Sequence, residues 1–117
     1  MIGEGQIVLF RFPQTDQISA KLRPALVLRR LPGQFEDWLI CMISSQLGQE
    51  IFGFDERVAV SDPDFISSGL RVASVIRIAR LAVVEEAVLR GAMGKVAPER
   101  VARIKSKLGQ WIVGREG

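Results

Sequence analysis

The chain has 117 residues, of which 48% are apolar and 25% charged, so it can bury a core and form a single domain over residues 1–117. It contains no histidine and one cysteine, which excludes a Ser-His-Asp triad, a histidine-based metal site, an internal disulfide and a cysteine-type zinc site within one chain. The net charge of +3 permits an anionic partner without requiring one, and no cofactor is expected.

Short apolar runs bounded by glycine, proline and polar residues predict the strands of this domain. The first run, Gln6–Phe12, is ended by Pro13, and the polar stretch Pro13–Ala20 is expected to be a loop in which Asp16 forms a turn. Further strands are expected at Ala25–Leu28, at Trp38–Ile43, at the short edge segment Arg57–Val60 and at the alternating segment Arg71–Ile78. The single Cys41 lies in one of these apolar runs and is expected to be a small core residue.

The last third of the chain is expected to contain two helices with a loop between them. Ala82–Leu89 is predicted to form a short helix, and Gly91 and Gly94 are predicted to bracket a loop. Pro98 fits the first turn of a final helix, because its missing N–H is harmless there. That helix has an apolar face of Val101, Ile104, Leu108, Trp111 and Ile112, and its cations are expected to lie on the solvated side, namely Arg100, Arg103, Lys105 and Lys107.

The predicted fold is mainly β with α. Loops between neighbouring strands are too short for helical crossovers, so the sheet should be mostly antiparallel and strongly bent, or closed into a small barrel, with a helix packed at the end. No apolar run reaches the roughly 20 residues that cross a bilayer. Residues 1–6 lack the basic-then-apolar order of a signal peptide, so we expect a cytoplasmic protein with no membrane contact.

Arg23 is the first polar feature beside a buried strand. Lys21 precedes it by two residues, and Pro24 follows it and biases its backbone toward extended geometry. A guanidinium held in this way presents a rigid fork of donors that suits a phosphate group. A surface arginine engaged in a salt bridge would fit the same residues.

Two further polar features follow along the chain. Ser44-Ser45-Gln46 ends a strand, where hydroxyl groups hold a phosphate or ribose hydroxyl, or else cap backbone groups. Arg77 and Arg80 could form a basic patch together with Lys21, Arg23, Arg29 and Arg30, which the sequence alone does not decide. Phe52-Gly53-Phe54 carries the aromatic side chains most expected to be exposed for stacking on bases.

Several segments occur in a recognisable order. A glycine and an apolar strand, Gly5–Leu9, precede a polar loop and then the segment Lys21–Leu28, in which a basic residue and Arg-Pro lead into a small apolar strand. A later strand ends in the pattern Ile-Ser/Thr-x-Gln at Ile43–Gln46, and Ser74–Ile76 begins another. Together with a Gly94-containing segment and a closing helix, this ordered set covers most of the chain and resembles the PemK/MazF family of toxins from type II toxin–antitoxin systems.

The resemblance implies a fold, an activity and partners. The fold would be a small SH3-like β-barrel with a C-terminal helix, assembled as a homodimer. The activity would be that of a metal-independent endoribonuclease, which cuts single-stranded RNA such as mRNA and so inhibits growth. A small antitoxin protein would neutralise the toxin by covering its basic groove with an extended acidic segment.

The resemblance also implies residue roles. The family's key arginine maps onto Arg23 and its Ser/Thr onto Ser44, the two expected catalytic residues. The RNA 2′-hydroxyl would attack the adjacent phosphate and leave a cyclic phosphate, while Arg23 stabilises the developing charge and Ser44 orients the phosphate or ribose. A guanidinium is too basic to accept a proton easily. The other residues expected to contact RNA are Lys21, Pro24, Ser45, Gln46, Arg77 and Arg80.

Three positions depart from the family pattern. Gln6 stands where an Asp is usual, and the lost carboxylate could remove a structural partner of the arginine or a contributor to activity. Leu22 stands where Lys or Arg is common, and Ala79–Ala82 replaces a Gln-Ile-Arg-Thr sequence. These departures favour a second hypothesis, a non-catalytic barrel module that binds nucleic acid or protein. A third hypothesis keeps the fold but directs it at a protein machine instead of RNA.

Overall fold

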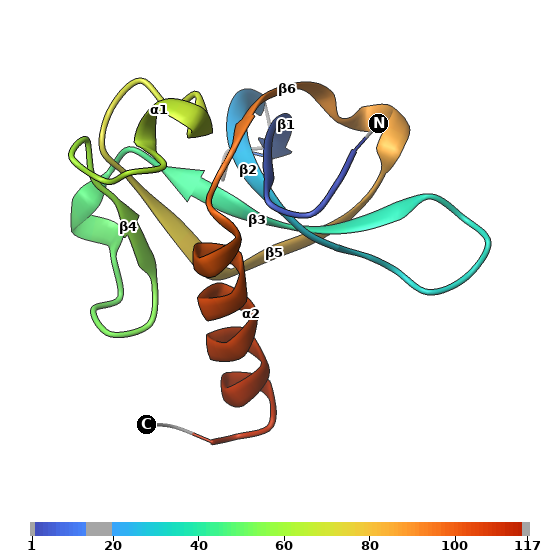
Figure 1. Ribbon diagram of the computed structural model, residues 1–117. Coiled ribbons are helices and arrows are strands. Elements are labelled where there is room, and N and C mark those ends of the chain that lie inside the picture. Colours follow the sequence, from blue (N-terminus) through green and yellow to red (C-terminus); the bar gives the residue numbers. More distant parts are fainter. Residues whose placement is uncertain (1, 14–19, 116–117) are drawn as a thin grey trace.

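A computed structural model describes residues 2–13 and 20–115, excluding the side chains of residues 12, 13, 20 and 21. It shows a curled sheet from which a long helix runs toward the C-terminus (Figure 1). The strands are β1 (Gln6–Pro13), β2 (Ala20–Arg30), β3 (Asp37–Ser44), β4 (Glu56–Val58), β5 (Ser74–Glu85) and β6 (Arg90–Lys95). The α-helices are α1 (Phe65–Ser68) and α2 (Pro98–Ile112), and single 3₁₀ turns lie at Leu47–Gln49 and Glu86–Val88.

The described strands form one six-stranded antiparallel sheet in the order β4-β5-β3-β2-β1-β6. The expected bent antiparallel sheet with a C-terminal helix is therefore confirmed, as a half-barrel. The expected loop at Pro13–Ala20 falls largely on residues 14–19, which lie outside the described residues.

An apolar cluster covers each face of the sheet. Neighbouring residues such as Ile7 and Val8 belong to different clusters, as the two-residue period of a strand requires. The first cluster includes Ile104 and Leu108 of α2, which pack against the sheet. Cys41 belongs to this cluster and is fully buried, which confirms the core assignment, and burial raises the pKa of its thiol.

The structure corrects two predictions for the last third of the chain. Ala82–Leu89 is not a helix, because β5 continues to Glu85 in register with β3 and only then makes a 3₁₀ turn. The alternation of exposed Val83 with half-buried Ala82 and Val84 is a strand pattern, and pairing with β3 overrides the local helix preference. The expected loop around Gly91 is strand β6, which pairs with β1.

A bulge bends β5 in the middle. The β3–β5 register passes from Met42 opposite Arg77 to Cys41 opposite Leu81, so residues 78–80 have no partner on β3. The N–H of Ile78, which the bulge removes from the ladder, donates to Oδ1 of Asp55 at 3.1 Å. A buried carboxylate thus supplies the hydrogen bond that the sheet cannot.

Arg100 anchors α2 with all five of its guanidinium N–H groups. Nε and Nη2 donate to the two oxygens of Asp64 at 2.8 and 3.0 Å. Nη2 also donates to Asp62 at 2.9 Å, and Nη1 donates to Glu56 at 3.1 Å and to the carbonyl of Arg57 at 3.0 Å. The side chain is only 7% exposed, so the expectation that it lies in solvent is wrong.

The acceptors of Arg100 have further partners. Asp64 Oδ2 accepts the N–H of Ala97, just before α2, at 2.9 Å. Glu56 accepts from Arg103 at 3.1 Å and from Lys107 at 3.0 Å, one helical turn apart on the same side of α2. Because every charge in this cluster faces an opposite one, its burial is tolerated.

The network lowers the pKa of two carboxyl groups. Hydrogen bonds from Arg100 hold the pKa of Asp64 below its usual 3.8, although burial acts in the opposite direction. Burial would raise the pKa of Glu56, but the hydrogen bonds from Arg103 and Lys107 outweigh it and bring the pKa below the usual 4.5. A carboxyl group whose pKa is depressed by folding stabilises the fold above its unfolded-state pKa, and this contribution is lost as pH falls through the folded-state pKa.

We predict that Arg100→Gln lowers the free energy of unfolding by about 3–5 kcal/mol at neutral pH, because it leaves buried carboxylates without a counter-charge. The wild type should lose stability as pH falls below about 4.5, and the variant should lose less over that range because its Asp64 no longer has a depressed pKa. Urea unfolding at a series of pH values measures both effects. Arg71→Gln, at an exposed arginine outside the network, serves as the control, and equal pH slopes for wild type and Arg100→Gln would contradict the prediction.

The end of α1 touches strand β6 backbone to backbone. A Cβ atom on Gly94 would collide with the carbonyl oxygen of Ser67, and one on Gly69 would collide with that of Met93. Gly69 also has a φ of 76°, which L-residues with side chains rarely adopt. The Ser67 hydroxyl donates to the carbonyl of Lys95 at 3.0 Å, so α1 is fixed directly on the edge strand.

We predict that Gly94→Ala destabilises the protein by about 3 kcal/mol or more, because backbone atoms on both sides must move apart. Gly109→Ala is the matched control, since Gly109 is exposed in α2 with open space around its Cα. It should stabilise the protein by about 0.5–1 kcal/mol through helix propensity. Denaturant midpoints compare the two variants, and an unchanged midpoint for Gly94→Ala would show that the contact yields easily.

Candidate functional site

The sheet register places Arg23 and Ser44 on one face of the sheet. Arg23 lies in β2 opposite Phe10 of β1. The β2–β3 ladder begins with Ala25 opposite Met42, and Arg23 and Ser44 each lie two residues beyond this pair, toward the same end of the sheet. Because side chains alternate along a strand, both point to the face that Ala25 and Met42 share.

Two more arginines share this face. Ser44 pairs with Val75 of β5, which in turn pairs with Arg57 of β4. Arg77 pairs with Met42 and is therefore the diagonal neighbour of Ser44, roughly 7 Å away. We call the set Arg23, Ser44, Arg57 and Arg77 the arginine face.

The guanidinium of Arg23 is available to a ligand. The side chain is half-buried inside β2, which begins at Ala20 and not at Ala25 as expected, and it forms no salt bridge or hydrogen bond with another residue of the described chain. The surface salt bridge that the sequence left open is thus not what the structure shows for this part of the chain. Pro24, also half-buried, lies opposite Leu9. Lys21 belongs to β2, but its side chain lies outside the described residues.

Ser44 combines both roles that the sequence left open. Its side chain is buried, and Oγ accepts the N–H of Gln46 at 3.0 Å, which caps the end of β3. Within the described chain the hydroxyl hydrogen has no acceptor, so it remains able to donate. Ser45 and Gln46 are exposed and follow directly, at the rim of the arginine face.

The other two members of the arginine face are held by acidic or amide groups. Arg77 is 14% exposed; its Nη1 donates to Gln49 Oε1 at 3.2 Å, and its Nε lies 3.9 Å from Asp55 Oδ2. Arg57 contacts Glu50 at 2.7 Å and is half exposed. Sequence reasoning missed Arg57 as a site residue, although the buried-exposed-buried alternation of β4 is the signal that would have turned it toward this face.

Arg80 and the loop Phe52-Gly53-Phe54 are not part of the arginine face. Arg80 is exposed and belongs to the β5 bulge, so the register does not bring it to the arginine face. Phe52 is 95% exposed, as expected of a stacking residue. Phe54 is half-buried instead, because its ring packs on Trp111 with centroids 6.0 Å apart.

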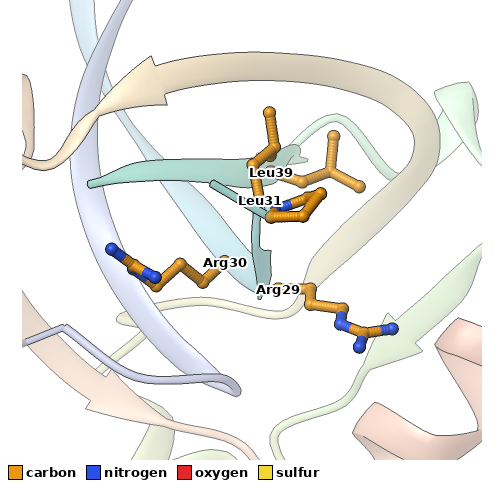
Figure 2. A pocket seen from close by; sticks show the side chains of 5 residues that line it. Arg29, Arg30, Leu31 and Leu39 are labelled. Carbon is orange, nitrogen blue, oxygen red and sulfur yellow. The ribbon is translucent and has the colours of Figure 1, made fainter. Parts of the chain in front are cut away.

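A separate hollow lies at the far end of β2. It is lined by Arg29, Arg30, Leu31, Pro32 and Leu39. Figure 2 shows that Arg29 and Arg30 extend to opposite sides, as consecutive strand residues do. Arg30 is also engaged with the carbonyl of Phe35 at 3.2 Å. Because the two guanidinium groups diverge, this hollow does not form an anion clamp.

Comparison with known proteins identifies the family. A family model described as the PemK-like, MazF-like toxin of type II toxin-antitoxin system matches residues 4–112. The chain belongs to this toxin family. No curated protein matches its sequence.

Two solved structures share the fold of this toxin. An endoribonuclease in complex with its cognate antitoxin from Mycobacterial species has a TM-score of 0.69 and 11% identity, over 100% of both chains. The MazE–MazF complex from Deinococcus radiodurans has a TM-score of 0.64 and 18% identity, over 98% of this chain and 97% of that one. Both confirm the small barrel with a C-terminal helix.

The position of Gln6 in this toxin limits what its departure from the family pattern means. Its Oε1 accepts the N–H of Gly3 at 2.9 Å, which closes the N-terminal turn. It stands four residues before Phe10, the partner of Arg23, and so about 13 Å away along β1. Within one chain, a carboxylate at position 6 would therefore lie four strand residues away from the cross-strand partner of Arg23.

Proposed function

We propose that this toxin is a metal-independent endoribonuclease that cuts single-stranded RNA, including mRNA, and so inhibits growth. The observation that carries the proposal is the placement of Arg23 and Ser44 on one face of the sheet, two residues beyond the Ala25–Met42 pair, with Arg77 diagonal to Ser44. The presence of an endoribonuclease among the proteins with this fold supports it. Cytoplasmic location is part of the proposal, and neither helix of the described chain is long and apolar enough to cross a membrane.

The chemistry needs only groups that this face can supply. The 2′-oxygen of the RNA forms a bond to the adjacent phosphorus, the bond from phosphorus to the 5′-oxygen breaks, and the proton of the 2′-hydroxyl finishes on the leaving oxygen. Arg23 donates hydrogen bonds to the phosphate oxygens as charge builds on them. The Ser44 hydroxyl donates to the same phosphate or to a ribose oxygen.

The remaining residues bind the strand. In this proposal Arg77 contacts a phosphate next to the cleaved one, while Ser45 and Gln46 contact ribose or base groups at the rim. The other residues expected to contact RNA are Lys21, Pro24 and Arg80. We add Arg57, because it pairs with Val75, the cross-strand partner of Ser44. The three arginines of the arginine face, Arg23, Arg57 and Arg77, favour a polyanion, because each phosphate contact releases condensed counterions.

We predict that the purified protein cleaves single-stranded RNA in the presence of EDTA and yields 2′,3′-cyclic phosphate ends. Arg23→Ala should lower kcat by about 10²–10³-fold, the usual cost of removing one donor from a developing oxyanion. Ser44→Ala should also lower kcat, with about 1 kcal/mol less stability because the Gln46 N–H loses its cap. Mass spectrometry of the fragments and single-turnover kinetics measure the outcome.

The control for both variants is Arg90→Ala, at an exposed arginine of β6, on the far side of β1 from β2. The Arg90→Ala variant loses one positive charge, as Arg23→Ala does, but its arginine face is unchanged. Cleavage by Arg23→Ala at the wild-type rate would sink the proposal.

The second candidate function is a non-catalytic binding module. The observation that favours it is the Ser44 Oγ bond to Gln46, which is a complete structural role in itself. Such a module would bind RNA with an affinity that falls steeply with salt, and would release no cyclic phosphate. Growth arrest on expression without RNA fragmentation would instead indicate a protein target.

The family membership gives this toxin an antitoxin as its partner, and we propose a homodimer as its own assembly. A patch of exposed apolar side chains that line one hollow supports the dimer: Ile51 and Phe52 in the loop before β4, and Trp111 near the end of α2. Figure 1 shows this end of α2 projecting away from the sheet. Monomers rarely expose such contiguous apolar surface, and two copies related by a twofold axis would cover it.

We predict that light scattering coupled to size-exclusion chromatography gives twice the mass of one chain, 26 instead of 13.0 kDa as a rough value. Phe52→Glu should shift the mass to that of one chain at micromolar concentration, because two buried carboxylates would face an apolar partner. Val72→Glu, at another exposed apolar residue outside the patch, should leave the mass unchanged. A monomeric wild type would reject this assembly.

A further inference from the structure

The carboxylate of Asp55 is buried, and its hydrogen bonds with backbone N–H groups do not account for the burial of a charged group. Its side chain is 1% exposed. Oδ2 accepts the N–H of Ile51 at 2.8 Å, and Oδ1 accepts the N–H of Ile78 at 3.1 Å. These two bonds fix the turn before β4 and the bulge of β5, yet both are bonds from neutral donors. A full negative charge in a dry site needs a cation as well.

Arg77 supplies that cation. Its Nε lies 3.9 Å from Asp55 Oδ2 and is buried, with no hydrogen-bond partner among the described residues. On the other side of the same guanidinium, Nη1 donates to Gln49 at 3.2 Å. The group is thus restrained from two directions, while both N–H groups of Nη2 have no acceptor within the described chain.

We propose that Asp55 is a positioning residue, which holds Arg77 so that its Nη2 donors meet an RNA phosphate beside Ser44. The inference rests on the proposed function. The separation of 3.9 Å between Nε and Oδ2 is too long for a hydrogen bond. When a phosphate draws the guanidinium into place, Nε–H closes on Asp55, so the carboxylate strengthens its hold as the ligand binds.

The bulge in β5 explains why Arg77 needs a positioning residue. Arg77 stands beside a three-residue bulge, where the backbone is not held by β3 on its C-terminal side. The Asp55 bond to the N–H of Ile78 replaces the missing ladder bond at the next residue. One carboxylate therefore fixes both the backbone that carries Arg77 and the side chain itself.

A double-mutant cycle tests the proposal. Asp55→Asn keeps an acceptor oxygen and removes the charge, and we expect it to lower kcat about 10-fold with KM changed less than about 2-fold. In an Arg77→Gln background the same change should lower kcat by less than about 2-fold, because Asp55 acts through Arg77. Equal losses in the two backgrounds would show that Asp55 serves the fold alone and would overturn the proposal.

The matched control is Asp37→Asn, at a half-buried carboxylate at the opposite end of β3, which should leave kcat and KM unchanged. Thermal unfolding of each variant separates loss of fold from loss of positioning. If the wild type cleaves no RNA, the proposed function fails. The dissociation constant for single-stranded RNA is then measured for the same four proteins of the cycle in place of kcat.

A measurement on the wild type covers the case in which Asp55→Asn does not fold. The NMR signal of the Arg77 Nε–H, assigned by its loss in Arg77→Gln, should shift downfield and exchange more slowly with solvent when an uncleavable 2′-deoxy strand is added. Both changes report a new hydrogen bond at Nε. An unchanged signal at saturating strand would overturn the proposal.

Discussion

The guanidinium of Arg100 has five N–H groups, and each of them finds an acceptor between residues 56 and 64. This one side chain ties α2 to strand β4 and to the turn before α1. With α2 fixed there, Ile104 and Leu108 are pressed on the sheet. The turn before α1 in turn sets α1 on strand β6, where Gly69 and Gly94 allow the backbones to touch. These contacts connect the two edge strands of the half-barrel, β4 and β6, through α1 and α2.

The sequence allowed the strands to be predicted, for reasons that are local. Apolar runs bounded by turn residues mark β1, β2 and β3, although β2 begins at Ala20 and so contains Pro24, which was expected at its mouth. The placement of Arg23 and Ser44 on one face is a property of register. Once both strands are accepted as antiparallel neighbours, the buried faces leave little choice of register, because a slip of one residue would expose the core.

The rest could not be read from the sequence because it depends on distant partners. Arg100 looks like any solvated helix cation until Glu56, Asp62 and Asp64 are known to surround it. Residues 82–85 carry a helix-like composition, and only the ladder with β3 makes them a strand. Asp55 sits in a loop of the sequence, and its contacts with Arg77 and Ile78 join positions more than 20 residues apart.

Arg23, Ser44 and Arg77 stand on paired strands, not on a loop. Side chains on such a backbone lose little further freedom when a ligand arrives, because the strands hold their spacing before binding. The backbone that carries them therefore needs no ordering step when the toxin leaves its antitoxin, and only side chains have to adjust to a ligand.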